Sequence, residues 1–174
     1  MGRIRELESG ERYAVPYAPR RILESGLARL LTDLHGRDSL RGLSVDSFAM
    51  RMAQLYADLD YLHPFSEGNS RTLRMFTRHL ARAVGFDLDW SPSNADGVAR
   101  DRLYQARDVA VIHRAFPELD EQRAMVTDDR MEYETFWVLQ KLQQASPLEA
   151  LIREYVTPFH SSQQSRARDN ELER

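Results

Sequence analysis

The 174 residues include 24 basic and 27 acidic side chains, which give a formal net charge of −3 and exclude an overall polycation that holds nucleic acid by bulk charge. No cysteine is present, which excludes a disulfide scaffold, a thiol nucleophile and a thiolate-bound metal. No stretch approaches ~18 consecutive apolar residues, and the charged start lacks the apolar centre of a secretory signal. We therefore expect one compact domain with neither a nucleic-acid nor a membrane partner.

The first predicted element is a short, exposed β-hairpin at residues 4–17. Ser9-Gly10 can form its turn, and Pro16 and Pro19 confine its second strand to the edge of a sheet. No other segment of the chain has a strand-like pattern, so this hairpin is the only β-structure that we predict.

Helical periodicity follows Pro19, with apolar residues at steps of three and four. A first helix is predicted from about Ile22 to Leu34. A second begins after an N-cap at Ser44 and ends near His63, because the proline that follows disfavours helix in the residue before it.

Further helices are predicted over about residues 70–84, 95–111, 129–145 and 147–156. The predicted fold class is therefore all-α with one hairpin, in a single domain over residues 1–158. Residues 159–174 are almost free of apolar side chains, and we expect them to form a disordered tail.

The loop between the second and third predicted helices, at residues 63–74, carries groups suited to phosphate chemistry. A loop that runs into a helix N-terminus presents unpaired N–H groups, which favour an anion. Gly68 permits a positive φ, so that these groups converge, and Asn69 adds a neutral amide donor. Arg71 and Arg74 share one side of the first helical turn, where guanidinium groups suit phosphate oxygens.

Two further residues complete this pattern. Glu67 places one carboxylate in a cationic site, which suits a Mg²⁺ ion that bridges two phosphates. His63 ends the preceding helix, and imidazole is the common general base for a hydroxyl nucleophile. Base, carboxylate, anion site and two arginines within twelve residues predict phosphoryl or nucleotidyl transfer.

The segment HPFSEGNSRTLR, residues 63–74, resembles the signature of Fic-domain proteins, HPF-x-(D/E)-G-N-G-R-x-x-R. Only Ser70 departs from the signature, in place of its second glycine. We expect helical dihedral angles at Ser70, at which serine costs little. The resemblance covers about residues 2–145 and implies a compact Fic-type helical bundle. In its adenylyltransferase branch, AMP is transferred from ATP to a Ser, Thr or Tyr hydroxyl of a target protein, and pyrophosphate is released.

The resemblance also implies a role for each matched residue. His63 would deprotonate the target hydroxyl, and Glu67 would coordinate Mg²⁺ bound to ATP. The α- and β-phosphates would lie in an anion hole formed by Gly68, Asn69 and the backbone of Ser70.

The remaining signature residues have implied roles as well. Arg71 would hold the β-phosphate and Arg74 the γ-phosphate region, while Phe65 would anchor the loop in the core. The hairpin at residues 4–17 resembles the family's flap, which holds the target protein by strand pairing.

An inhibitory helix with the pattern (S/T)-x-x-x-E-(G/N) pairs with the second arginine in many Fic proteins. Residues 165–170 are similar, with aspartate in place of glutamate, but we favour either a separate antitoxin-like protein as the inhibitor or no inhibitor at all. Tyr104 and Gln105 are candidates for contacts with the base and ribose. The expected location is cytoplasmic, and export by a dedicated secretion system remains compatible with the sequence.

Several alternatives stay open. Doc-like kinases have alanine and lysine at the positions of Gly68 and Ser70, so Gly68 favours AMP transfer over phosphoryl transfer. Relatives that transfer UMP or phosphocholine remain compatible with the loop. Ser70 also keeps open a catalytically weak module that binds nucleotide or protein. The arginine stripe at residues 71–82 is the one feature that favours a nucleic-acid binder, and the net negative charge opposes it.

Overall fold

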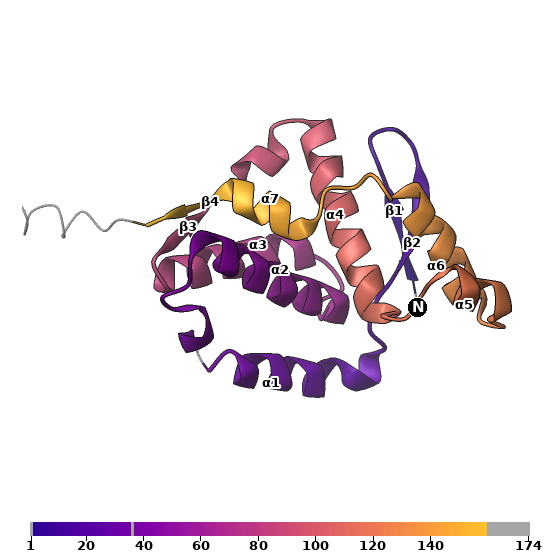
Figure 1. The fold of residues 1–174 in the computed structure, drawn as a ribbon, viewed down its shortest axis with the longest axis horizontal. Helices are drawn as coiled ribbons and strands as arrows, with labels where there is room; N and C mark the ends of the chain where they lie inside the picture. The colour runs from indigo at the N-terminus through magenta and orange to yellow at the C-terminus, as the bar shows by residue number, and fades with distance from the viewer. Residues whose placement is uncertain (1, 36, 160–174) are drawn as a thin grey trace, which may run out of the picture.

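The computed structural model describes residues 2–35 and 37–159. Within these ranges the chain forms seven α-helices (Figure 1). They are α1 (Leu23–Asp33), α2 (Val45–Leu62), α3 (Asn69–Ala83), α4 (Gly97–Ala115), α5 (Glu121–Val126), α6 (Arg130–Lys141) and α7 (Leu148–Tyr155). Four short strands form two antiparallel pairs, β1 (Gly2–Glu6) with β2 (Arg12–Pro16) and β3 (Phe86–Leu88) with β4 (Val156–Pro158). The predicted helical fold with a hairpin near the N-terminus is confirmed.

The hairpin β1–β2 starts two residues earlier than predicted, with a register from Gly2 opposite Pro16 to Glu6 opposite Arg12. Gly10 adopts a φ of 81° in the turn, a conformation that glycine reaches without strain. On β2, the alternating side chains of Tyr13 and Val15 are buried in a cluster with residues of α4 and α6. This packing holds the hairpin against the helices, and Figure 1 shows it beside α4 and α6.

Helix α2 is the centre of the bundle and packs against α1, α3, α4 and α7. Ser44 caps its N-terminus as predicted, because the Ser44 hydroxyl accepts a hydrogen bond from the Ser47 N–H at 3.2 Å. Phe48, Met52 and Tyr56 have no exposed surface, and their spacing of four residues places them on one face. The helix ends at Leu62, directly before the loop of interest.

Helix α1 is confirmed near its predicted bounds, but it lies at the margin of the bundle (Figure 1). None of its side chains is fully buried. Gly26 of α1 faces α2, since a Cβ atom at this position would lie 2.7 Å from Cδ2 of Leu62. A larger residue at this position would require the Leu62 side chain to shift.

The sequence missed two features. Helix α5 begins after Asp120, whose side chain accepts a hydrogen bond from the Arg123 N–H at 2.7 Å. The pair β3–β4 joins segments about seventy residues apart, and three-residue strands leave too short a pattern to detect. The expectation of a single strand pair was therefore wrong.

Residues 160–174 of the predicted tail, including the inhibitor-like pattern at residues 165–170, lie outside the described residues, whereas the Phe159 N–H donates to the Gly85 carbonyl at 2.8 Å. Among the helices that are described, none combines the length and apolar character required to cross a membrane.

Candidate active site

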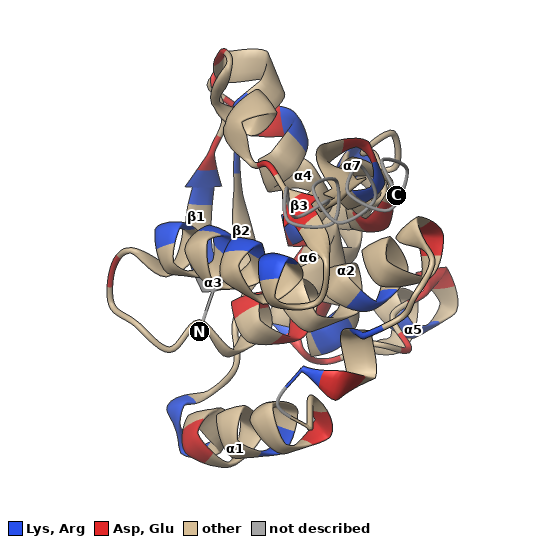
Figure 2. Cartoon of the chain, turned by 90° about the vertical axis from the view of Figure 1, so that its left-hand side faces the viewer, with Lys and Arg blue, Asp and Glu red and all other residues tan. Residues whose placement is uncertain are grey.

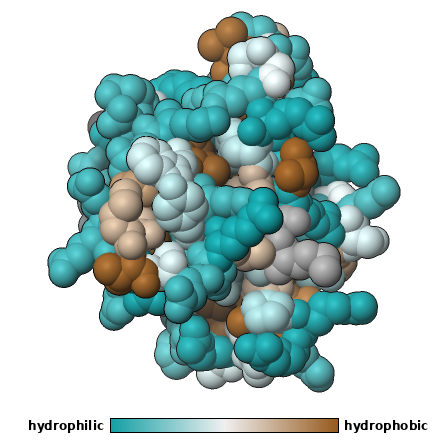
Figure 3. All heavy atoms as spheres, turned by 90° about the vertical axis from the view of Figure 1, so that its right-hand side faces the viewer, coloured by the Kyte–Doolittle hydropathy of each residue, from teal (hydrophilic) through white to brown (hydrophobic). Residues whose placement is uncertain are grey.

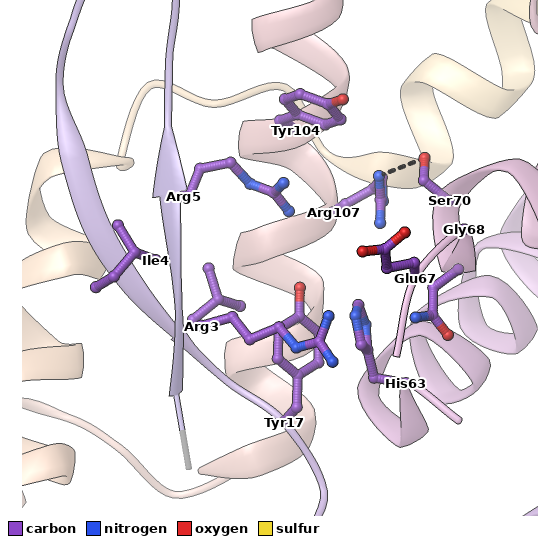
Figure 4. Close-up of a pocket in the computed structure, with 12 residues that line it drawn as sticks. Arg3, Ile4, Arg5, Tyr17, His63, Glu67, Gly68, Ser70, Tyr104 and Arg107 are labelled. Carbon is purple, nitrogen blue, oxygen red and sulfur yellow. Dashed lines mark hydrogen bonds between the residues drawn. The ribbon is translucent and has the colours of Figure 1, made fainter. Parts of the chain in front are cut away.

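A cavity of about 270 Å³ opens between the hairpin, the loop after α2 and helix α4. Figure 4 shows the side chains that surround it. Strand β1 contributes Arg3, Ile4 and Arg5, and helix α4 contributes Tyr104 and Arg107. The loop and the start of α3 form the remaining wall, with His63, Glu67, Gly68, Asn69 and Ser70.

His63 forms the end of this wall that lies nearest to α2. It has left-handed backbone angles, φ 46° and ψ 57°, and its N–H donates to the Leu59 carbonyl at 3.2 Å. Its ring packs on Tyr17, with 4.0 Å between the ring centroids. Nδ1 lies 3.7 Å from Oδ1 of Asp60, one turn earlier. The imidazole therefore borders the cavity while one nitrogen faces a buried carboxylate.

Gly68 precedes α3 with φ 78° and ψ 3°, which confirms the expected positive φ. Asn69 lines the cavity, and its side chain also bonds back to the loop. Its Oδ1 accepts from the Phe65 N–H at 3.0 Å, and its Nδ2 donates to the Phe65 carbonyl at 2.6 Å. These two bonds close the loop and orient the N-terminus of α3 toward the cavity.

The expectation that Phe65 anchors the loop in the core was wrong, because its side chain is 50% exposed. The loop is held by the Phe65 backbone through Asn69, as described above, so the ring itself is free to point outward. Arg3 adds a link from the hairpin, since its Nη1 donates to the Ser66 carbonyl at 3.0 Å.

Ser70 lies inside the first turn of α3 and has no positive φ, so the expected helical conformation is confirmed. Its hydroxyl accepts a hydrogen bond from Nη1 of Arg107 at 3.0 Å. Arg107 also binds Asp60 through two bonds of 3.0 and 2.9 Å. Both members of this ion pair are buried, with exposed fractions of 2% for Arg107 and 0% for Asp60.

The buried pair alters the protonation behaviour of both groups. Burial alone would raise the pKa of Asp60, but the charge of Arg107 and the contact with His63 outweigh it and hold that pKa below its ordinary value. Burial opposes the charge of Arg107 as well, yet Asp60 keeps the pKa of Arg107 above its ordinary value. Both groups are therefore charged at neutral pH.

Arg71 and Arg74 do not line the cavity. They belong to a neighbouring groove of about 510 Å³ that also includes Arg78 and Arg82. All four arginines belong to α3, whose ribbon carries a row of blue segments in Figure 2; we call these four residues the basic row. Arg74 donates to Oδ1 of Asn94 at 2.8 Å, which turns it away from His63.

Arg71 links the groove to the cavity. Its Nη2 lies 3.8 Å from the point that a Cβ atom on Gly68 would occupy. The Arg71 guanidinium is therefore at the rim of the anion site, while Arg74 is one turn farther along α3.

Glu67 is the one carboxylate among the cavity-lining residues, and its side chain projects into the cavity (Figure 4). In the described part of the chain, no three His, Cys, Asp or Glu residues are grouped so that they could hold a metal ion. A cation here would depend on Glu67 together with ligand oxygens and water, a mode that Mg²⁺ commonly uses.

Sequence reasoning missed Asp60 and Arg107. Asp60 had a visible signal, because an acidic residue interrupts the apolar pattern of α2 three residues before His63. Arg107 had none, since its helix is far from the loop in sequence. Of the two candidates for base and ribose contacts, Tyr104 lines the cavity, whereas Gln105 is not among the lining residues.

The hydropathy of the face that carries the hairpin and α6 is mixed, with apolar side chains scattered among polar ones (Figure 3).

The chain is similar in sequence to known proteins. Residues 2–81 match the sequence model of the Fic/DOC family. The chain is 38% identical over 84 residues to protein adenylyltransferase VbhT of Bartonella schoenbuchensis, which covers 48% of this chain and 16% of that protein. It is 41% identical over 69 residues to a protein adenylyltransferase of Bartonella henselae, which covers 40% of this chain and 13% of that protein. The chain thus spans less than a fifth of the length of either relative.

The fold is similar to that of the BepC protein of Bartonella tribocorum, solved with bound AMPPNP. The TM-score is 0.57 at 23% identity, over 91% of this chain and 64% of that chain. At this identity the similarity concerns the fold alone. The match to the Fic/DOC family model, over residues 2–81, includes the whole loop at residues 63–74.

Proposed function

We propose that the protein transfers AMP from ATP to a Ser, Thr or Tyr hydroxyl of a target protein, with Mg²⁺ as cofactor and pyrophosphate as the second product. The observation that carries this proposal is that the His63 imidazole, the Glu67 carboxylate and the N-terminus of α3 border one cavity. The two relatives named as protein adenylyltransferases and the AMPPNP bound to BepC support the same activity.

In the proposed reaction, His63 accepts the proton of the target hydroxyl. The oxygen attacks the α-phosphorus, and the bond from this phosphorus to the oxygen that bridges the α- and β-phosphates breaks, so that pyrophosphate leaves. The N–H groups at the start of α3, beside Gly68, Asn69 and Ser70, face the negative charge of the α- and β-phosphates. Arg71, at the rim, is placed to bind the β-phosphate, and Arg74 is available only to a γ-phosphate that extends along α3.

Glu67 would hold the Mg²⁺, because it is the carboxylate that projects into the cavity and Mg²⁺ takes one or two carboxylates together with phosphate oxygens. When bound, the ion supplies positive charge that neutralises the phosphates. The protein itself would contribute the position of the Glu67 carboxylate, because Glu67 lies on the loop that the two Asn69–Phe65 hydrogen bonds hold in place.

The target protein would lie against the hairpin. Arg3 and Ile4 of β1 line the cavity, and Ile4 is 61% exposed, so an extended segment that pairs with β1 would carry its hydroxyl toward His63. A separate antitoxin-like protein as inhibitor and a cytoplasmic place of action also belong to this proposal.

The test is incubation of the protein with cell lysate and nucleotides that carry a label at a defined position. AMP transfer predicts protein labelling from α-labelled ATP in the presence of Mg²⁺, and loss of the label in His63→Ala. Label from γ-labelled ATP would instead show phosphoryl transfer. Label from UTP or from a phosphocholine donor would show the chemistry of the other relatives, and ATP binding without transfer would show a binding module.

A further inference from the structure

The buried ion pair between Asp60 of α2 and Arg107 of α4 lies at the wall of the cavity, which Arg107 lines. Each partner makes one contact beyond the pair. Oδ1 of Asp60 lies 3.7 Å from Nδ1 of His63, and Nη1 of Arg107 donates to the Ser70 hydroxyl at 3.0 Å. One pair therefore touches both the proposed base and the proposed anion site (Figure 4 shows the Arg107–Ser70 bond).

The net stability gained from such a pair is small. Removal of two charges from water offsets most of their attraction, and apolar residues of similar volume often serve equally well. Stability alone therefore does not explain well why α2 and α4 each place a charged side chain at their buried interface. The contacts of these two side chains with His63 and Ser70 explain it better.

A neutral imidazole can carry its proton on either ring nitrogen, so a neighbouring group must determine which nitrogen of His63 is protonated. Nδ1 is buried and makes no hydrogen bond with any described residue, and the charged group that faces it is the Asp60 carboxylate. A carboxylate at that position favours the proton on Nδ1 and leaves the lone pair on Nε2. Tyr17 packs on the ring and limits its rotation.

We propose that Asp60 and Arg107 are positioning residues for AMP transfer, an inference that rests on the proposed function. Asp60 keeps the proton on Nδ1 of His63, so that Nε2 can accept the proton of the target hydroxyl. Arg107 holds the Asp60 carboxylate in place through two hydrogen bonds and fixes the start of α3 through Ser70.

This arrangement also explains the departure of Ser70 from the family signature. A glycine at this position would leave Nη1 of Arg107 without its acceptor at 3.0 Å. A buried guanidinium that loses a partner is costly. We therefore expect Ser70→Gly, which restores the signature, to lower activity in this chain.

The experiment uses the full chain labelled with ¹⁵N and the double variant Asp60→Ala/Arg107→Met, which removes both charges together. The matched control is Arg102→Met/Glu154→Ala, because Arg102 and Glu154 form a doubly hydrogen-bonded pair of 2.8 and 2.7 Å on α4 and α7. That control pair is exposed to solvent and does not line the cavity.

The first measurement is the tautomer of His63, from two-bond ¹H–¹⁵N correlations assigned by comparison with His63→Gln. We expect protonated Nδ1 in the wild type and in the control, and a shift toward protonated Nε2 in the double variant. The second measurement is AMP transfer. We expect kcat to fall by about 100-fold in the double variant and to stay within twofold of wild type in the control.

The proposal is overturned if the folded double variant keeps both the Nδ1 proton and the wild-type kcat. If the double variant does not fold, Asp60→Asn decides the question. Arg107 would hold the oxygen of the new amide and leave the amide NH₂ group toward His63, so protonated Nε2 is expected; an unchanged tautomer contradicts the proposal. If wild type shows the expected tautomer but transfers no AMP, the proposed function fails while the positioning of His63 by Asp60 stands.

Discussion

Arg5 of β1 and Asp108 of α4 are joined by two hydrogen bonds of 2.7 Å each. Asp108 has no exposed surface, and it also accepts from the Tyr13 hydroxyl of β2 at 3.0 Å. The Arg5 guanidinium further lies 4.4 Å from the ring centre of Tyr104. One buried carboxylate on a helix thus fixes both strands of the hairpin that borders the cavity.

Loss of this link should destabilise the protein. Arg5→Met leaves the Asp108 charge buried with only the Tyr13 hydroxyl as a polar side-chain partner, so we expect the free energy of unfolding to fall by about 3 kcal/mol. Urea denaturation measures this change. Arg12→Met on the same hairpin is the control: its pair with Glu6, at 3.6 Å, is exposed, and its removal should cost less than about 1 kcal/mol. Equal losses in the two variants would contradict the role of Arg5.

His63→Ala should abolish AMP transfer without loss of fold. General base catalysis contributes about 10²–10⁴-fold, so the initial rate of labelling from α-labelled ATP should fall at least 100-fold. The melting temperature should stay near that of wild type, because Nδ1 of His63 makes no hydrogen bond with the described residues. His113→Ala, on the exposed side of α4, is the control and should keep full activity.

Gly68→Ala should impair nucleotide binding through the backbone. At φ 78° alanine is strained by about 1–2 kcal/mol, and relief of the strain would turn the N–H groups at the start of α3. We expect KM for ATP to rise at least tenfold. Gly42→Ala bears similar strain at φ 67°, with nothing within 4 Å of its added Cβ, and should lose the same stability while KM stays unchanged. A rise in KM in both variants would point to general destabilisation instead.

Arg71→Met should raise KM for ATP about tenfold and leave the fold intact. Arg71 is exposed and lies at the rim beside Gly68, where a lost charge-assisted hydrogen bond to phosphate is worth about 1.5–3 kcal/mol. Arg78→Met, two turns along the same face of α3, is the matched control. If Arg78→Met weakens ATP binding equally, the basic row acts as a diffuse field and Arg71 has no specific contact.

Arg107→Met should make stability strongly dependent on pH. In wild type the pKa of Asp60 lies below its unfolded value of about 3.9, so its stabilising contribution is complete above that pH and is lost as pH falls through the folded value. In the variant, burial without the guanidinium raises the Asp60 pKa, so the ionised form is penalised as pH rises. His63, Tyr17 and Tyr56 remain near the carboxylate, and none of them replaces the two hydrogen bonds of Arg107.

The difference in unfolding free energy between wild type and Arg107→Met should therefore be about 3–5 kcal/mol at pH 7 and shrink toward pH 3. Denaturant titrations at several pH values measure it. Arg102→Met, which breaks an exposed pair, should show a difference below about 1 kcal/mol with little change over the same range. A constant difference for Arg107→Met would contradict the assigned cause.

Local signals in the chain were sufficient for the loop and its flanking helices. Proline after His63 ends α2, glycine at position 68 permits the turn, and the apolar period predicts α3, all through interactions within a few residues. The same reasoning failed for Phe65, because the sequence shows that a residue is apolar but not whether another group already anchors its backbone. Asn69 fills that role.

The sequence by itself determined the helical class, the hairpin and the identity of the loop residues 63–74, because each depends on short-range periodicity or on backbone preferences. Only the tertiary structure decided that Arg107 pairs with Asp60, that Arg74 turns to Asn94, and that β3 meets β4. Such contacts join residues 20 to 70 positions apart, and their pairing follows from how the helices pack, which no local preference specifies.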